Sequence, residues 1–162
     1  MPEPRRETLL LQMDHAWGHP WESLQSALKG VTEDMATWQS PAYRDEPKEP
    51  GRPLPGSIAR HVQHLAACKA EYRLMILERP AKDPEGGSIP SGTFPDLLAA
   101  LTSAHEVLRA AVSALADADL QDPVGNGQPL SEYITMTIRH DTWHASQIAL
   151  ARRLWKTRME GN

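Results

Sequence analysis

Apolar residues recur at three- and four-residue spacing along three stretches of the chain, which predicts amphipathic helices. These stretches are residues 57–79, 95–116 and 129–156, and each is rich in residues that favour helix. Ser57 stands where the first of them needs an N-cap. The stripes are formed by Ile58, Val62, Leu65, Lys69, Tyr72 and Ile76, by Leu97, Leu101, Leu108, Val112 and Leu115, and by Leu130, Ile134, Ile138, Ile148 and Trp155.

The N-terminal region has a less regular pattern, because Gly18 and Pro20 fall where a helix interior would otherwise lie. We expect a short N-terminal helix with a break near Gly18. A second helix is expected to run from about Pro20 to Lys29 and to be closed by Gly30.

Proline and glycine gather in residues 40–56, 79–95 and 122–129, which predicts loops there. No sustained alternation of β-branched residues proposes a sheet, so the expected fold class is all-α. Four amphipathic helices with polar connections indicate one four-helix bundle domain over residues 1–162. The segment 40–56 is long enough to cross over the bundle, so long crossover loops are expected rather than simple up-down-up-down order.

The formal charge of −4 and the pI near 6.0 argue against binding nucleic acid, which needs a basic surface. The basic residues at 152–158 stand where the last helix would end, and there cations complement the helix dipole. A single cysteine forms no intrachain disulfide, so a cytoplasmic location is expected. No stretch approaches the roughly 20 apolar residues of a membrane span, so no membrane association is expected.

His140 and His144 lie four residues apart in the last predicted helix, which places both on one face, toward the core. Two buried imidazoles side by side are satisfied either by hydrogen bonds or by a shared cation. A second such pair, His15 and His19, spans Gly18, so helix capping explains it more simply.

A metal needs a third ligand, and the helix at 57–79 offers His61, in the apolar stripe, or His64, on its flank. Three imidazoles make an open, catalytic-type site that suits zinc and tolerates nickel, iron or copper. Cys68 and Glu71 follow His64 by one and two turns, although a lone helical cysteine is more often a small core residue. His105 is interpreted as a solvated or hydrogen-bonded surface group.

The segments "SIARHVQHL" and "HDTWHASQ" together resemble the DinB-like (DinB/YfiT-like) superfamily of metalloenzymes. In that family a histidine before Leu or Ile follows a Ser-Ile-like pair, and a late helix carries His-x-x-x-His-x-x-Gln. Smaller similarities are "WESLQSALKGVTEDMATWQSP" and "LADADLQDPV". The resemblance spans nearly the whole chain.

Carried over residue by residue, the resemblance makes His64, His140 and His144 the ligands of a divalent cation, and so selects His64 over His61. Gln147 falls at the family's glutamine position, and Asp141 follows the first histidine of the pair. For Asp141 an N-cap, an ion pair and a bond to a metal ligand all remain open. Together with Glu71, these two residues are candidates for a shell around the ligands.

The resemblance implies a bundle that often dimerises. It also implies transfer of low-molecular-weight thiols such as mycothiol, bacillithiol or glutathione, or metal-dependent isomerase or hydrolase activity. We therefore expect a homodimeric enzyme on a small-molecule substrate, using zinc or nickel before iron or manganese, with a thiol as a candidate cosubstrate. The alternatives are a non-catalytic metal-binding stress-response dimer and a metal-free bundle with hydrogen-bonded histidines.

Overall fold

The computed structural model describes residues 5–79, 88–125 and 127–160. Long helices dominate them, and the expected all-α class is confirmed. The helices are α1 (Arg6–Gly18), α2 (Leu24–Leu28), α3 (Glu33–Thr37), α4 (Ile58–Glu78), α5 (Phe94–Ser113) and α6 (Leu130–Glu160). Two 3-10 turns, η1 (Pro41–Tyr43) and η2 (Asp117–Gln121), and two short strands, β1 (Pro123–Val124) and β2 (Gln128–Pro129), connect them.

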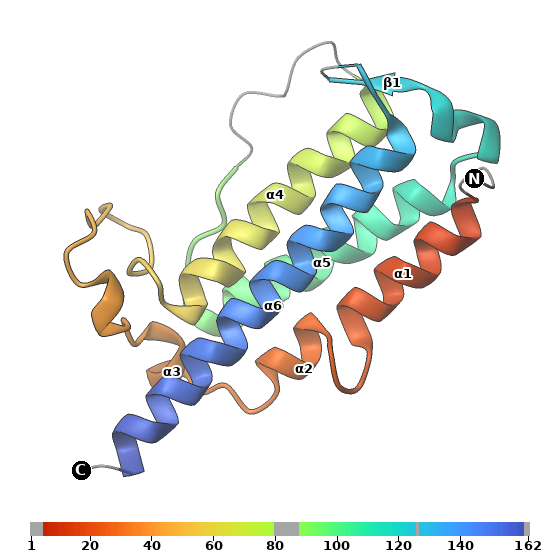
Figure 1. Ribbon diagram of the computed structural model, residues 1–162. Coiled ribbons are helices and arrows are strands. Elements are labelled where there is room, and N and C mark those ends of the chain that lie inside the picture. The colour runs from red at the N-terminus through yellow and green to blue at the C-terminus, as the bar shows by residue number, and fades with distance from the viewer. Residues whose placement is uncertain (1–4, 80–87, 126, 161–162) are drawn as a thin grey trace.

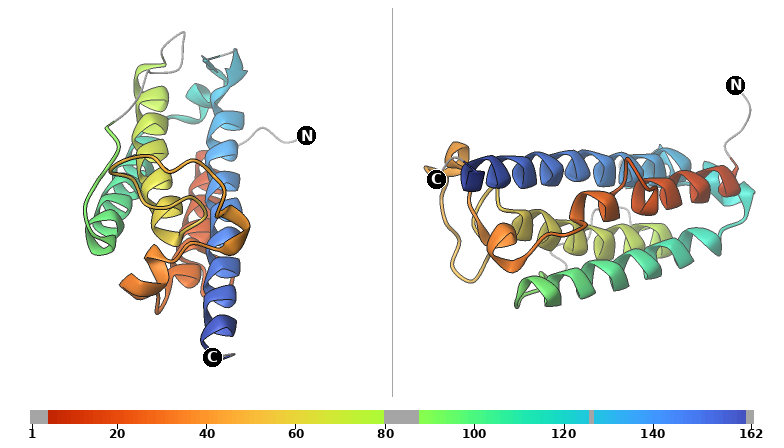
Figure 2. Two further views of the ribbon diagram at one scale, coloured as in Figure 1. Left: turned by 90° about the vertical axis from the view of Figure 1, so that its left-hand side faces the viewer. Right: turned by 90° about the horizontal axis from the view of Figure 1, so that it is seen from below.

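The long helices lie lengthwise against one another as a four-helix bundle (Figure 1). Seen from below, α4 and α5 form one layer, and α6 forms the other with α1 and α2 (Figure 2). The helices α1 and α2 lie one after the other, and together they make up the fourth helix of the bundle. Helix α6 spans about 46 Å at about 1.5 Å per residue, so it contacts both α1 and α2.

Helices α4 and α5 run in the same direction, because both begin beside α3 and both end near the turn η2. Helices α4 and α5 are therefore parallel neighbours, whereas a simple up-down order would make them antiparallel (Figure 1). The loop at 40–56, which we expected to cross over, stays at the end of the bundle where α4 begins. The order is thus not simple up-down-up-down, as expected, although the loop at 40–56 does not cross the bundle.

The start of α4 follows the capping rule read from the sequence. The Ser57 hydroxyl accepts a hydrogen bond from the Arg60 amide at 3.2 Å, which confirms the expected N-cap. Just before it, Gly56 has a φ of +69°, and a Cβ there would overlap the Tyr43 ring. Glycine is therefore required where the loop at 40–56 enters α4.

The break near Gly18 is confirmed, but the second helix begins at Leu24 rather than Pro20. Ser23 supplies its N-cap by accepting from the Ser26 amide, so the preceding residues form a bend instead of a first turn. At its other end, the Arg152 guanidinium of α6 donates to the carbonyl oxygens of Ser26, Ala27 and Lys29. A side chain of the last helix thus closes α2.

Residues 122–129, expected to be only a loop, include the antiparallel pair β1 and β2. Gly125 and Gly127 both have positive φ, which lets the chain turn between two such short strands. Among the described residues no helix is long and apolar enough to span a membrane.

The apolar core of the bundle has two parts. One part joins α2, α3, the first halves of α4 and α5 and the second half of α6, and includes Leu65, Leu101 and Ile148. The other joins α1, the second halves of α4 and α5 and the start of α6, and includes Met13 and Leu108. Along the bundle axis, the boundary between the two parts lies near His140 and His144 of α6.

Candidate metal centre

His140 and His144 lie on one face of α6, as their spacing predicts. Their Nε2 atoms are 3.0 Å apart. His144 is buried and His140 is half-buried. The pair therefore lies in the seam between α6 and α4, close to the surface of the molecule. Helix periodicity therefore brings two imidazole nitrogens to one point.

His64 approaches this pair from α4. Its Nε2 lies 3.3 Å from the Nε2 of His140, and its ring centroid lies 5.0 Å from that of His144. The residues that the resemblance names as ligands thus come together from two helices.

Two other side chains contact the outer nitrogens of the α6 pair. His61 places its Nδ1 2.9 Å from the Nδ1 of His144. The Tyr72 hydroxyl lies 3.0 Å from the Nδ1 of His140. Each α6 ring is held by its outer nitrogen while its Nε2 faces the other ligands, which is how proteins orient the histidines of metal sites. Helix periodicity does not distinguish His61 from His64 as the third candidate ligand. In the structure His64 contacts the Nε2 of His140, whereas His61 contacts the Nδ1 of His144.

The Cys68 thiol lies beside the histidine cluster. Its Sγ is 3.5 Å from the Nε2 of His64, and the thiol is half-buried. Ligand atoms of His64, Cys68 and His140 all lie within 4.8 Å of one another, so this trio can hold a metal ion. The sequence places Cys68 one turn past His64 and favours a small core residue, and the structure adds the short distance between the sulfur and the His64 ring.

The histidines are neutral near pH 7. Burial, followed by the charge of neighbouring histidines, lowers the pKa of His144 to about 3, and burial lowers the pKa of His140 and of His61 to about 4. Burial first, then Arg52 and Arg60, also lowers the pKa of His64. A neutral imidazole keeps the lone pair that a metal needs.

The Cys68 thiol has the opposite shift. Burial, together with the Glu71 carboxylate, raises its pKa to about 11. Cys68 is therefore a thiol at neutral pH, and a coordinated cation would convert it to the thiolate.

Three distances between neighbouring donor atoms are close to those around a tetrahedral ion, whereas the trio whose ligand atoms all lie within 4.8 Å of one another contains Cys68 and not His144. Two nitrogens that each lie about 2.0–2.1 Å from zinc are about 3.3–3.4 Å apart, and a nitrogen and a thiolate sulfur are about 3.5–3.6 Å apart. The Nε2 spacings of 3.0 and 3.3 Å and the sulfur–nitrogen distance of 3.5 Å lie close to these values.

The three residues predicted to surround the ligands lie in different positions. The Asp141 carboxylate forms an ion pair with Lys69 at 2.6 Å, which is one of the roles left open. Gln147 is half-buried one turn beyond His144. Glu71 lies near enough to raise the pKa of Cys68 and to oppose the lowering of the pKa of His64.

The interpretation of His105 as a solvated surface group is wrong. The ring is buried, stacks on Trp17 at a centroid distance of 3.9 Å, and has its Nδ1 3.4 Å from the Lys69 amine. Its position between Leu101 and Leu108 on the apolar stripe of α5 was the missed signal. His19 acts as expected at the end of α1, where its amide donates to the His15 carbonyl oxygen.

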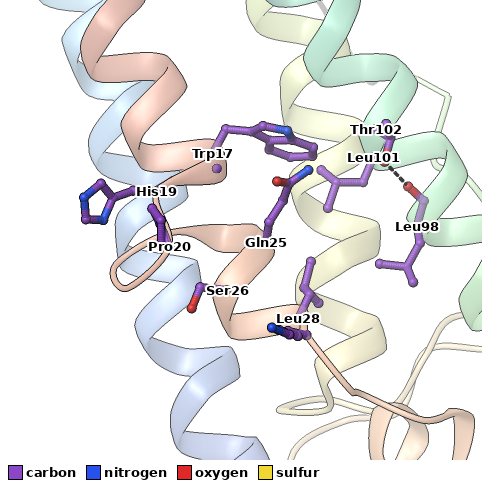
Figure 3. Close-up of a pocket in the computed structure, with 11 residues that line it drawn as sticks. Trp17, His19, Pro20, Gln25, Ser26, Leu28, Leu98, Leu101 and Thr102 are labelled. Atoms are coloured by element: carbon purple, nitrogen blue, oxygen red, sulfur yellow. Dashed lines mark hydrogen bonds between the residues drawn. The ribbon is translucent and has the colours of Figure 1, made fainter.

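A cavity of about 490 Å³ lies elsewhere, between the α1–α2 break and α5. Figure 3 shows Trp17, Gln25 and Leu101 directed toward one another across it. None of the six clustered side chains lines this cavity, namely His61, His64, Cys68, Tyr72, His140 and His144. The candidate metal centre is therefore a separate, half-buried site at the seam of two helices.

The comparisons with known proteins agree with the residues gathered here. No curated protein and no solved structure matches the chain. The model of the DinB superfamily matches residues 8–148, a span that includes every candidate ligand. The chain therefore belongs to the DinB superfamily, which is known for metal binding.

Proposed function

We propose that this protein is a metal-dependent enzyme acting on a small molecule, with a divalent cation held by His64, His140 and His144. The observation that carries the proposal is the convergence of imidazole nitrogens from α4 and α6 at 3.0 and 3.3 Å. Zinc and nickel suit this donor set best, followed by iron and manganese.

The placement of the ligands favours catalysis over a purely structural role. Three protein ligands leave a coordination position for a substrate, whereas structural zinc sites are usually closed by four. His64, Cys68 and His140 are half-buried, so solvent reaches this side of the cluster. A bound divalent cation supplies Lewis-acid chemistry, which makes a water or a thiol nucleophilic at neutral pH.

The chain's own residues would prepare the site for that chemistry. Tyr72 and His61 orient the α6 rings through their outer nitrogens. Burial keeps the rings of His140 and His144 neutral, so one nitrogen of each ring stays unprotonated. Thiol transfer and hydrolysis are the proposed reaction types. A low-molecular-weight thiol cosubstrate and a homodimer are also proposed, and these two rest on the resemblance alone.

The first experiment measures metal content by inductively coupled plasma mass spectrometry on protein purified without a histidine tag or chelator. We expect about one zinc or nickel per chain, and loss of that metal in His140→Ala/His144→Ala. The matched control is His15→Ala/His19→Ala, which removes the other histidine pair at the same spacing and should keep the metal. Wild-type protein that neither contains nor takes up zinc, nickel, manganese or iron would refute the proposal.

Turnover separates the enzyme from its main alternative. Metal-loaded protein is assayed with thiol acceptors and activated esters, in the presence of glutathione, bacillithiol or mycothiol. Metal-dependent turnover supports the enzyme. Stoichiometric metal with strong thermal stabilisation, but without turnover, supports a non-catalytic metal-binding stress-response protein. Sedimentation velocity of the same sample tests the homodimer.

A further inference from the structure

A buried polar layer separates the two apolar parts of the core. It contains Lys69 from α4, His105 from α5 and Asp141 from α6, which are 1%, 2% and 3% exposed. Trp17 of α1 completes it, so α1, α4, α5 and α6 each contribute one side chain. Charged groups are almost never buried to this degree unless they are paired.

The members of this layer satisfy one another. The Lys69 ammonium donates to Asp141 Oδ2 at 2.6 Å and lies 3.4 Å from His105 Nδ1. It also lies 5.7 Å from the centroid of the Trp17 ring, whose other contact is the stacked imidazole of His105. These contacts hold the Lys69 ammonium and the Asp141 carboxylate in one relative orientation within a packed core.

Stability does not explain such a pair. Removing two charges from water costs about as much as their attraction returns, and apolar residues of similar volume are often equally or more stable. The polar layer lies between Leu65 and Met75 of α4, where the neighbouring core is apolar. An apolar pair at positions 69 and 141 would continue that core.

The position of the pair in the chain is informative. Lys69 directly follows Cys68, and Asp141 directly follows His140. The ion pair thus joins α4 to α6 one residue beyond a candidate metal ligand on each helix. Apolar contacts are non-directional, whereas a bond of 2.6 Å between two charged atoms sets how far one helix can slide along the other.

A metal site tolerates only small displacements of its ligands, so a restraint on the sliding of α4 along α6 is useful to it. A slip of one residue moves a helix by about 1.5 Å along its axis, and metal ligands must be held within about 0.5 Å. His64 and His140 come from different helices, so the distance between their Nε2 atoms depends on that register.

We propose that Lys69 and Asp141 are positioning residues for the metal centre, and that their buried ion pair fixes the register of α4 against α6. This inference rests on the proposed metal site. It assigns the pair a function in metal affinity and coordination geometry rather than in stability.

The test replaces the pair by Lys69→Met/Asp141→Leu, which keeps the core filled without charge. The matched control, Arg109→Met/Asp14→Leu, removes the ion pair between α5 and α1 that lies away from the ligands. For each protein we would measure the metal-free melting temperature, the zinc Kd against a chelating dye, and the visible spectrum of the cobalt-substituted form.

We expect the Lys69/Asp141 double variant to melt at or above the wild-type temperature. Its zinc Kd should rise about 10- to 100-fold, the range found when groups behind metal ligands are lost. Its cobalt spectrum should also change, since that spectrum reports coordination geometry. The control should keep the wild-type Kd and spectrum.

Other outcomes would overturn the inference. A double variant with the wild-type Kd and cobalt spectrum leaves the metal site standing but removes the positioning role. Wild-type protein that binds neither zinc nor cobalt refutes the inference together with the site. If the double variant does not fold, Asp141→Asn, which keeps the shape and an acceptor for Lys69, replaces it and should still weaken zinc binding; an unchanged Kd there overturns the proposal.

Discussion

The Nδ1 atoms of His61 and His144 lie 2.9 Å apart, so His144 faces His61 with its outer nitrogen and His140 with its inner one. His61 and His64, three residues apart on α4, thereby lie on different sides of the same ring cluster. This arrangement predicts that the two histidines of α4 have separable functions.

His61→Ala and His64→Ala are predicted to differ in zinc affinity. Loss of His64 removes a proposed ligand and should abolish stoichiometric binding. Loss of His61 removes only a partner of His144 and should raise the Kd about 10- to 100-fold. Isothermal titration of both variants with zinc measures the difference. The reverse order would make His61 the ligand.

Cys68→Ala decides whether the thiol joins the ligands. If the sulfur that lies 3.5 Å from His64 Nε2 binds the ion, cobalt-substituted wild-type protein should show a thiolate-to-metal charge-transfer band. That band should vanish in Cys68→Ala, with weaker zinc binding. His144→Ala serves as the comparison, because it should weaken zinc binding and keep the band. A wild-type spectrum without the band would leave a ligand set of histidines alone.

His105→Phe is predicted to make the protein less sensitive to acid. Burial, then Lys69, lowers the pKa of His105 to about 3, against roughly 6.5 in an unfolded chain. Between these values the unfolded chain binds a proton that the folded protein excludes. Stability is therefore lost as the pH falls from 6.5 toward 3, by up to about 1.4 kcal/mol per pH unit.

Phenylalanine keeps the stacking on Trp17 and removes this proton. Lys69, Asp14 and Arg109, the charged groups that shift the pKa of His105, remain in both proteins. Urea unfolding at pH 7, 6, 5 and 4.5 should give a shallower decline of the unfolding free energy in His105→Phe. Parallel declines would show that His105 does not contribute to acid sensitivity.

Gly56→Ala is predicted to destabilise the entry to α4 more than Gly51→Ala does. Both residues have positive φ, which costs a residue with a side chain about 1–2 kcal/mol. Only at Gly56 would the new methyl group overlap the Tyr43 ring, whereas nothing lies within 4 Å at Gly51. Overpacking adds about 1–3 kcal/mol. Equal melting temperatures for the two variants would contradict this account.

The long helices and the ligand pair of α6 could be predicted from the sequence because both depend on local spacing. The stripe beginning at Ile58 and the cap at Ser57 gave α4 to within one residue at each end. His140 and His144 share a face for the same reason. The family motif then named His64, which periodicity alone did not distinguish from His61.

The remaining features depend on contacts between distant segments. The partnership of Lys69 with Asp141 joins residues 72 apart in the chain, although a lysine inside an apolar stripe was a visible signal. The proximity of Cys68 to His140, and the burial of His105 beneath Trp17, follow from how the helices face one another. Helix periodicity gives a side chain's direction on its own helix but not which helix it meets.

A five-residue helix such as α2 does not persist in water by itself, because starting a helix is unfavourable. Its terminal carbonyl groups accept from Arg152, which comes 123 to 126 residues later in the chain. A ribosome adds about 5–20 residues per second from the N-terminus, so α2 and His64 wait several seconds for α6 to be made. A metal centre built from His64 and His140 would therefore form together with the packed N-terminal helices, after α6 has been made.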